Sequence, residues 1–484
     1  MQFTSFSFLL FAALLLVLYY TIPRKGQWVL LLVASYGFYL WAGLQNLFYI
    51  LLTTLTTYGA TLLIELNQKK LDKKTAKKKN RLWVLLAVCI NFGLLAVCKV
   101  RFTFANLVLP LGISFYMFQS MGYVLDVYRA GTKAEKNPLK LALFVSYFPQ
   151  LVQGPISKFH MLAPQLFSTH AYDGKQVSFG LQRMLWGYFK KMVIADRIAV
   201  AVVALKGPEY TGMSFFVLTL FYAVQIYGDF TGGIDIAVGL SEAFGIRLPE
   251  NFVRPFFSKN IAEYWRRWHI SLGEWMKDYI FYPVSVSSPM RKLSKAARKK
   301  WPHFGKRLPV YAASFLTWFC TGIWHGVTPN FILWGMMNCT VIVISEELSP
   351  LYERFHNRFH LKEKKWYGGF EMLRMFILMN LIRIVDLFPN VAEYFRRMGS
   401  MFTSFRVPFD KLGLTGLDYG ILLGGIAVLF AVSVLQEKKG SVRELLWERA
   451  ALRYALIIAL FLVVLLMGSY GIGYDAGNFI YNQF

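Results

Sequence analysis

The sequence predicts an all-α membrane protein that crosses the bilayer many times, and three observations carry this prediction. Of the 484 residues, 56% are hydrophobic. Only 17% are charged, against about 25% in an ordinary soluble domain. The formal net charge of +26 comes from Lys and Arg gathered between apolar runs, which is typical of cytoplasmic loops. Disordered, collagen-like and disulfide-scaffold classes are excluded, and the position of the charge argues against nucleic-acid binding.

The first four apolar runs set the expected topology. A spanning helix needs about 20 mostly apolar residues, and the runs Phe6–Ile22, Trp28–Ala42, Leu47–Ile64 and Leu82–Val97 approach this length. The first run has no positive flank before it and no small-residue cleavage site after it, so we expect a retained span and no cleaved signal peptide. The basic stretch 65–81 is expected in the cytoplasm, which places the N-terminus outside.

Further apolar stretches continue the pattern. They run over about 107–125, 139–153, 178–205, 213–245, 310–325, 331–345, 370–388, 417–435 and 452–470. We therefore expect about 11 to 13 membrane segments, including re-entrant and interfacial helices. No repeat, low-complexity tail or linker rich in Gly, Ser or Pro divides the chain, so we expect a single membrane domain over 1–484.

A second basic stretch, 286–309, is also expected to be a cytoplasmic loop. Together with 65–81 it carries 16 of the 53 Lys and Arg residues. Two interpretations are open for these loops. They are either topology determinants that contact anionic lipids, or they help to attract an anionic cytosolic donor such as a CoA thioester.

Ionisable residues inside apolar segments are costly and are therefore functional candidates. Asp229 and Asp235 lie in an apolar stretch with Gly228, Gly232 and Gly233. Paired carboxylates bind a cation or relay protons. The alternative, which we favour, is that they cap helices broken at the glycines or pair with arginines of the next segment.

A second candidate lies in the stretch Tyr264–Tyr279. At about 100° per residue, one helical face collects Trp265, Trp268, His269, Leu272, Trp275, Met276 and Tyr279. The opposite face carries charge. This pattern predicts an interfacial amphipathic helix with His269 on its apolar, protein-facing side. Periodicity alone favours a packed core histidine over a catalytic one.

The third candidate is His325, in the stretch Thr321–Gly326. It ends an apolar run and is followed by Gly326 and Pro329, which predicts a helix that ends within or near the bilayer. Burial disfavours a charged imidazole, so a neutral His325 suits a general base. A packed core histidine is again the alternative.

Other patterns give no site. The four cysteines lie in apolar segments without a CxxC spacing and are interpreted as small buried side chains: Cys89, Cys98, Cys320 and Cys339. His356 and His360 have the helical spacing of metal ligands, but arginines lie beside them and no carboxylate intervenes, so we expect no metal. Nucleotide-binding fingerprints and a serine in a nucleophile elbow are not found.

The two histidine motifs, Trp265–Ser271 and Gly322–Gly326, resemble those of the membrane-bound O-acyltransferase superfamily. Three further stretches narrow the resemblance to the bacterial polysaccharide O-acetyltransferases, which include the membrane subunit for alginate acetylation. These stretches are Phe148–Ile156, Tyr188–Asp196 and Gln225–Asp235. The resemblance implies a helical core around a central tunnel, in a bacterial inner or plasma membrane.

The resemblance also assigns roles to residues. His325 would be the catalytic histidine and His269 the second active-site histidine, both facing the tunnel between a cytosolic donor and the acceptor. Asp229 and Asp235 would stay structural. Acetyl-CoA would be the donor substrate, with no cofactor bound permanently. Candidate contacts to the donor are Arg266, Arg267, Trp265 and Trp324.

The last six residues, Phe479–Phe484, resemble an aromatic hexapeptide that ends related enzymes. The resemblance implies that Tyr481 takes the acyl group and passes it to an extracytoplasmic partner, an SGNH-like or similar transferase that acetylates a polysaccharide. Asn482 occupies a position that is more often aromatic. The alternative is an interfacial aromatic anchor.

Three rival functions remain open. A sister family transfers D-alanine from a carrier protein to teichoic acid, although the patterns at 148–156 and 188–196 are closer to the acetyl branch. A proton-coupled transporter would use the buried carboxylates and histidines as a proton path, but no inverted repeat of broken helices is seen. A non-catalytic scaffold for glycan export would leave both histidine motifs unexplained.

Overall fold

The computed structural model describes residues 2–105, 109–470 and 479. Every regular element within these residues is a helix, and they form no strand. One isolated antiparallel bridge joins Phe252 and Trp268. The expected all-α class is therefore confirmed.

The chain divides into two compact units. The first comprises Met1–Asp196, Ile226–Pro249 and Ile421–Phe484, and the second comprises Arg197–Gln225 and Glu250–Gly420. Both candidate histidines belong to the second unit. The single domain expected over 1–484 stays a prediction.

The helices that precede residue 206 are short to medium in length apart from two long ones. They are α1 (Phe6–Thr21), α2 (Gln27–Trp41), α3 (Leu44–Lys70), α4 (Lys73–Ala105), α5 (Ile113–Tyr128), α6 (Pro138–Ser146), α7 (Phe148–Leu151), α8 (Phe159–Phe167), α9 (Gly174–Tyr188) and α10 (Asp196–Leu205), with the 3-10 turn η1 (Arg24–Gly26) and the π-helical η2 (Phe189–Ala195). Polar side chains begin several of them. The Ser5 hydroxyl accepts from the amide of Phe8 at 3.2 Å, and the carboxylate of Asp173 caps α9 in the same way.

The remaining helices include most of the second unit. They are α11 (Met213–Ala243), α12 (Ile261–Arg267), α13 (Ile270–Met276), α14 (Tyr282–Ser285), α15 (Ser288–Lys300), α16 (Pro302–His325), α17 (Pro329–Glu347), α18 (Ser349–Arg358), α19 (Lys365–Arg383), α20 (Val391–Gly399), α21 (Gly416–Lys439), α22 (Val442–Leu445) and α23 (Ala450–Met467). Short 3-10 or π turns connect them: η3 (Pro255–Phe257), η4 (Lys277–Phe281), η5 (Leu361–Glu363), η6 (Ile384–Leu387) and η7 (Phe409–Lys411).

Within the described residues, five helices are long and apolar enough to cross a membrane: α3, the part of α4 over Lys73–Arg101, α11, α21 and α23. The pair α17 and α18, bent by 54°, adds a sixth if it forms one broken span. The chain is thus a multi-pass membrane protein. The helices formed by the other apolar stretches do not pass this combined test of length and hydropathy, and the total of 11 to 13 segments stays a prediction.

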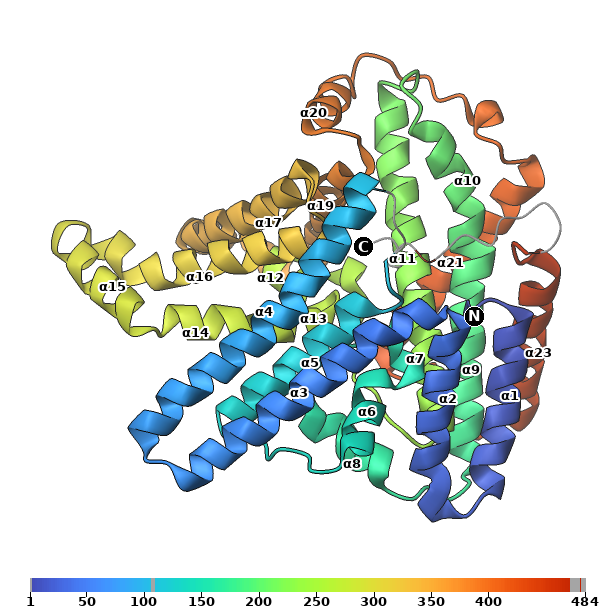
Figure 1. Cartoon of the computed structure of the whole chain (residues 1–484). Helices are drawn as coiled ribbons and strands as arrows, with labels where there is room; N and C mark the ends of the chain where they lie inside the picture. The colour runs from blue at the N-terminus through green and yellow to red at the C-terminus, as the bar shows by residue number, and fades with distance from the viewer. Residues whose placement is uncertain (1, 106–108, 471–478, 480–484) are drawn as a thin grey trace. The chain divides into compact units, whose positions relative to one another are not determined.

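Both basic stretches are largely helical, and their place as cytoplasmic loops stays a prediction. Over 65–81, α3 runs to Lys70 and α4 begins at Lys73, and the two helices lie side by side as a hairpin (Figure 1). Over 286–309, α15 and the start of α16 pair in the same way. Lys and Arg are good helix formers, and the Asp72 carboxylate accepts from the amides of Lys74 and Thr75, each at 3.0 Å.

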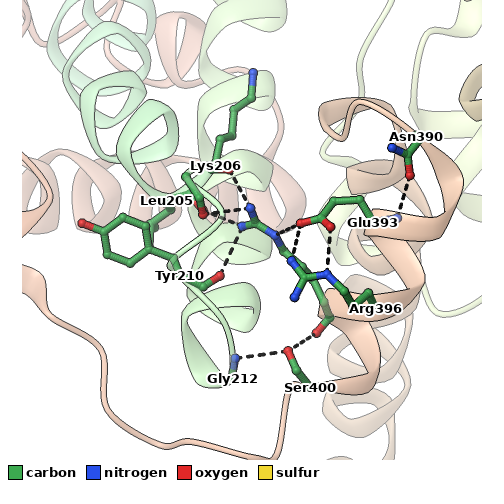
Figure 2. A network of polar contacts seen from close by, with 10 residues as sticks. Leu205, Lys206, Tyr210, Gly212, Asn390, Glu393, Arg396 and Ser400 are labelled. Carbon is green, nitrogen blue, oxygen red and sulfur yellow. Dashed lines mark hydrogen bonds and ion pairs between the residues drawn. The ribbon is translucent and has the colours of Figure 1, made fainter.

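A buried arginine fixes the end of α10 in the second unit. Arg397 of α20 is 2% exposed, and its Nε donates to Glu393 at 2.8 Å. Its other nitrogens donate to four carbonyl oxygens at 2.7–3.2 Å, those of Leu205, Lys206, Gly207 and Tyr210. The last carbonyls of a helix have no partner within it, so Arg397 caps α10. Figure 2 shows this network, with Ser400 linked to the amide of Gly212.

Candidate active site

A close helix pair places His325. It is the last residue of α16, just before α17. A Cβ atom on Gly322 would lie 2.6 Å from the carbonyl oxygen of Phe331, and one on Gly335 would lie 2.4 Å from that of Trp318. A larger side chain at either position would push the helices apart. The two glycines therefore hold His325 close to α17.

Tryptophan rings surround His325. Its imidazole centroid lies 4.7 Å from the ring of Trp334 and 4.5 Å from that of Trp324. Trp265 of α12 extends the cluster, at 5.9 Å from Trp334 and 4.8 Å from Trp318. The half-buried His325 thus lies in an aromatic setting, between the rings of two tryptophans.

The expected helix over Tyr264–Tyr279 is interrupted at His269, so the continuous amphipathic helix is wrong. α12 ends at Arg267 and α13 begins at Ile270. Between them His269 has φ 48° and ψ 51°, in the left-handed region. This conformation is uncommon for a residue other than glycine and recurs at functional sites.

A distant segment causes the interruption. The amide of Val253 donates to the carbonyl of Arg267 at 2.9 Å, and the amide of Ile270 donates to the carbonyl of Asn251 at 3.0 Å. These two bonds flank the bridge between Phe252 and Trp268. These two bonds occupy the carbonyl of Arg267 and the amide of Ile270, which a continuous helix would use for its own hydrogen bonds.

Asn251 is the residue that holds His269, and sequence reasoning missed it. Its Oδ1 accepts from the amide of Ser271 at 3.0 Å and from the Ser271 hydroxyl at 2.9 Å. The same oxygen lies 3.3 Å from Nδ1 of His269. Asn251 and His269 are both buried. A lone asparagine in a short connection carries no motif that would have revealed it.

The positive charge of the buried Arg383 acts on His269. The Arg383 guanidinium lies 3.8 Å from the centre of the Trp268 ring and donates to the hydroxyl of Tyr264 at 2.6 Å. Burial, reinforced by the positive charge of Arg383, lowers the pKa of His269 to about 3. His269 is therefore neutral near pH 7. Arg383 also carried no signal in the sequence.

The structure brings the two histidines into one aromatic cluster. Trp324 contacts both, with its ring centroid 6.0 Å from that of His269 and 4.5 Å from that of His325. Trp324 is buried. Residues of two sequence motifs thus meet around one indole ring.

The four residues expected to contact the acyl donor divide into a tryptophan pair and an arginine pair. Trp265 and Trp324 lie in the aromatic cluster. Arg266 is exposed, and Arg267 forms an ion pair with Glu263 at 2.8 Å, one helical turn earlier. Contact of these residues with a donor stays a prediction.

The carboxylates of α11 pair with basic side chains in the first unit. Asp229 lies 2.5 Å from Lys191, and Asp235 lies 2.6 Å from Lys190 and 2.9 Å from Arg183. Pairing was the favoured expectation. The partners, however, lie on the preceding α9 and η2 and not on the next segment, and two of the three are lysines.

The glycines of the same stretch do not break a helix, since α11 is continuous from Met213 to Ala243. Instead they allow another helix to approach. A Cβ atom on Gly232 would lie 2.9 Å from the carbonyl oxygen of Gly187 on α9. The expected helix break is therefore wrong, because close packing explains the small residues.

Tyr481 lies outside the described residues. Phe479, the first residue of the same hexapeptide, is described and is 2% exposed. Its ring lies 4.5 Å from the Lys191 ammonium and 6.1 Å from the ring of Phe3. Phe479 is thus packed inside the first unit.

The last candidates from the sequence are the possible metal ligands His356 and His360 and the cysteines. Over the described ranges, no three His, Cys, Asp or Glu side chains are grouped to hold a metal. His356 contacts the hydroxyl of Tyr367 at 2.8 Å, and His360 lies beyond the end of α18. Cys98 and Cys339 are buried as expected, whereas Cys89 is exposed on α4.

Comparison with known proteins identifies the family. A model of the membrane-bound O-acyltransferase family matches residues 133–298, a range that includes His269 and ends before His325. A probable alginate O-acetylase of Pseudomonas syringae pv. tomato is 34% identical over 89% of this chain and 81% of its own length. The chain belongs to the membrane-bound O-acyltransferase family. It is an O-acyltransferase, as the resemblance of its motifs implied.

Two other relatives show the breadth of the similarity. A peptidoglycan O-acetyltransferase of Helicobacter pylori is 28% identical over 72% of this chain and 68% of its own length. A teichoic acid D-alanyltransferase of Bacillus subtilis is 29% identical over 54% of this chain and 64% of its own length. Acetylases thus match more of this chain than the D-alanyltransferase does.

Proposed function

We propose that this protein transfers an acetyl group from cytosolic acetyl-CoA across the membrane for O-acetylation of an extracytoplasmic polysaccharide. The observation that carries the proposal is the meeting of His269 and His325 around Trp324, in a chain whose long matches are named as glycan O-acetylases. The membrane is the inner or plasma membrane of a bacterium, with the N-terminus outside.

His325 is the general base of this reaction. It removes the proton from the acceptor hydroxyl as the hydroxyl oxygen bonds to the thioester carbonyl carbon. The tetrahedral intermediate carries the charge on the former carbonyl oxygen, which needs a hydrogen-bond donor. When the intermediate collapses, the carbon–sulfur bond breaks and the CoA thiolate takes the proton back from His325. The tryptophans around His325 support this role because their rings cover part of the imidazole and shield it from solvent.

Acetyl-CoA reaches the site from the cytoplasm. The helical hairpins over 65–81 and 286–309 carry 16 of the 53 Lys and Arg residues, and this positive charge suits the phosphates of CoA. Contact with anionic lipids is the other role of these stretches. Trp265 and Trp324 are in place to contact the acyl thioester.

Tyr481 is the first acceptor. Its unperturbed pKa near 10 makes a base such as His325 useful. The acetyl ester then passes to an extracytoplasmic transferase, SGNH-like or similar, which acetylates the polysaccharide. Burial of Phe479, the first residue of the hexapeptide, supports this role because it fixes that residue within the protein.

The donor decides between this proposal and D-alanyl transfer to teichoic acid. We expect the purified protein in nanodiscs to release CoA thiol from acetyl-CoA and to gain one acetyl group by intact mass, with no gain in Tyr481→Phe. Turnover only with a D-alanyl carrier protein would show that the protein transfers D-alanine and not acetyl. Substrate flux in proteoliposomes without thioester consumption would refute both.

A further inference from the structure

Two neighbouring residues of η2 contact the C-terminal segment at two separate points. The carbonyl oxygen of Met192 accepts from the amide of Ser469 at 2.9 Å. The ammonium of Lys191 lies over the ring of Phe479, 4.5 Å from its centre. η2 is a π-helical turn, a rare form that recurs at functional sites. η2 is therefore a docking element for the described part of the C-terminal segment.

Two carboxylates hold the Lys191 ammonium independently of the ring. Asp229 lies 2.5 Å from it and Asp196 lies 2.8 Å from it. The Lys191 side chain is 1% exposed, and a cation this deeply buried needs such compensation. Both carboxylates lie in the first unit. The cation therefore has its place without the ring of Phe479, and the ring is the partner that can leave.

The surroundings of the Phe479 ring leave room for it. A Cβ atom on Gly233 would lie 3.0 Å from Cε1 of this ring and 1.6 Å from Oε1 of Gln153. A side chain at 233 would thus displace the Gln153 amide or press on the ring. Phe3 packs edge-on, with 6.1 Å between the two ring centroids, and its carbonyl accepts from the Tyr188 hydroxyl at 2.8 Å. The ring lies among groups that other contacts hold.

An ammonium over a ring face distinguishes an aromatic ring from an aliphatic side chain. The cation is attracted by the negative face of the ring, at centroid distances up to about 6 Å. The attraction is stronger where both groups are away from water, and Phe479 is only 2% exposed. Leucine would fill much of the same volume but has no such face. The site therefore favours an aromatic ring at position 479.

We infer that Lys191 is a positioning residue that binds the Phe479 ring by a cation–π contact and so docks the start of the C-terminal hexapeptide on η2. Tyr481 follows two residues later, and two residues of extended chain span at most about 7 Å. Docking of Phe479 thus restricts the space that Tyr481 can reach. This restriction removes freedom that the tyrosine would otherwise lose on acyl uptake. The link to acyl uptake rests on the proposed function, whereas the docking does not.

The test replaces Phe479 by monofluoro-, difluoro- and trifluorophenylalanine in the full-length protein in nanodiscs. Fluorine withdraws electrons from the ring face and weakens a cation–π contact while the shape is nearly kept. A carboxypeptidase removes residue 479 only after the ring has left its site, so the rate follows the released fraction. The same step in the unfolded chain corrects for the intrinsic cleavage of each ring. We expect the rate to rise with each fluorine, to about fivefold for the trifluoro ring. An equal rate along the series overturns the inference.

The variants Lys191→Met and Lys190→Met are a matched pair on η2. Lys190 is also buried, but its ammonium pairs with Asp235 at 2.6 Å. We expect the fluorine effect to disappear in Lys191→Met and to persist in Lys190→Met. An effect that survives in Lys191→Met overturns the inference, because it then comes from the size or polarity of fluorine. The wild-type series decides alone where Lys191→Met fails to fold. A trifluoro ring at the exposed Phe402 should leave the rate unchanged.

The effect on acyl uptake is measured separately. Phe479→Leu removes the ring face but keeps apolar volume. We expect it to slow acetyl gain by the chain, followed by intact mass in a single turnover, by about fivefold. The half-saturating concentration of acetyl-CoA should not change. Normal acetyl gain in Phe479→Leu refutes the positioning role of Lys191. Absence of acetyl gain in the wild type, with the fluorine effect intact, refutes the tyrosyl relay and confirms the docking.

Discussion

Gly322 and Gly335 face each other where α16 crosses α17: a Cβ atom on Gly335 would lie 3.4 Å from the Cα of Gly322. This contact sets the position of His325 at the end of α16. Gly322→Ala must separate the two helices, since its new methyl group would meet the carbonyl of Phe331. We expect a loss of about 1 to 3 kcal/mol in stability and a larger loss of acyl transfer. Thermal unfolding and thiol release measure the two effects.

The matched control for this substitution is Gly369→Ala. Gly369 lies in α19 of the same unit, with nothing within 4 Å of an added Cβ. Stability should stay the same or rise slightly, because alanine is the better helix former, and activity should not change. Equal effects of the two substitutions would show that helix contact does not position His325.

The buried ion pair of Asp229 and Lys191 predicts a large effect on folding. Asp229→Asn leaves the Lys191 charge, 1% exposed, without its full compensation, which costs roughly 3 to 5 kcal/mol. Glu363→Gln removes an exposed partner of His360 and should change stability by less than about 1 kcal/mol. Chemical denaturation in detergent compares the two. A stable, inactive Asp229→Asn protein would instead indicate a direct part for this carboxylate in the reaction.

Arg397 and Arg396 are adjacent, but we expect substitutions at the two positions to have very different effects on stability. Arg397→Lys loses most of the five hydrogen bonds of a buried guanidinium, and we expect a loss of roughly 3 to 5 kcal/mol. The Arg396 side chain is 53% exposed, so Arg396→Lys should cost less than about 1 kcal/mol. Unfolding curves of the two variants decide this. Similar midpoints would contradict the capping of α10 by Arg397.

The hydrogen bonds of Arg396 and Arg397 to Glu393 predict that the stability of the protein falls at acid pH. Hydrogen bonds from Arg396 and then Arg397 lower the pKa of Glu393 from 4.5 to about 2. A lowered pKa means that the carboxylate contributes stability above pH 4.5, and that this contribution is lost as the pH falls towards 2. Between pH 5 and pH 8, Glu393→Gln should therefore lower stability by a constant amount. A loss that grows with rising pH would contradict the assignment.

The packing of the Phe479 ring predicts that Phe479 protects the C-terminus from digestion. Phe479→Ala removes the ring between Lys191 and Phe3, so digestion by a carboxypeptidase should become several times faster than in the wild type. Phe402→Ala, an exposed aromatic position, should leave the digestion rate unchanged. An unchanged rate in Phe479→Ala would mean that this ring does not hold the hexapeptide.

The sequence predicted the class of the fold because composition and apolar runs are local properties. It also marked His269 and His325, since each lies in a motif that a single stretch of chain contains. The left-handed turn at His269 was missed because helical periodicity describes one segment, whereas the turn is made by pairing with Asn251 and Val253. Arg383 was missed for the same reason, as its effect depends on Trp268, far away along the chain. The partners of Asp229 and Asp235 were assigned to the wrong segment because spacing does not tell which helix packs against another.

The most direct test of the account replaces His325. His325→Ala and His303→Ala, which removes an exposed histidine paired with Glu347, are compared in nanodiscs with acetyl-CoA. We expect His325→Ala to lower CoA thiol release by about 100-fold or more at an unchanged unfolding temperature, while His303→Ala turns over like the wild type. Near-normal thiol release by His325→Ala would contradict the assignment of His325 as the base.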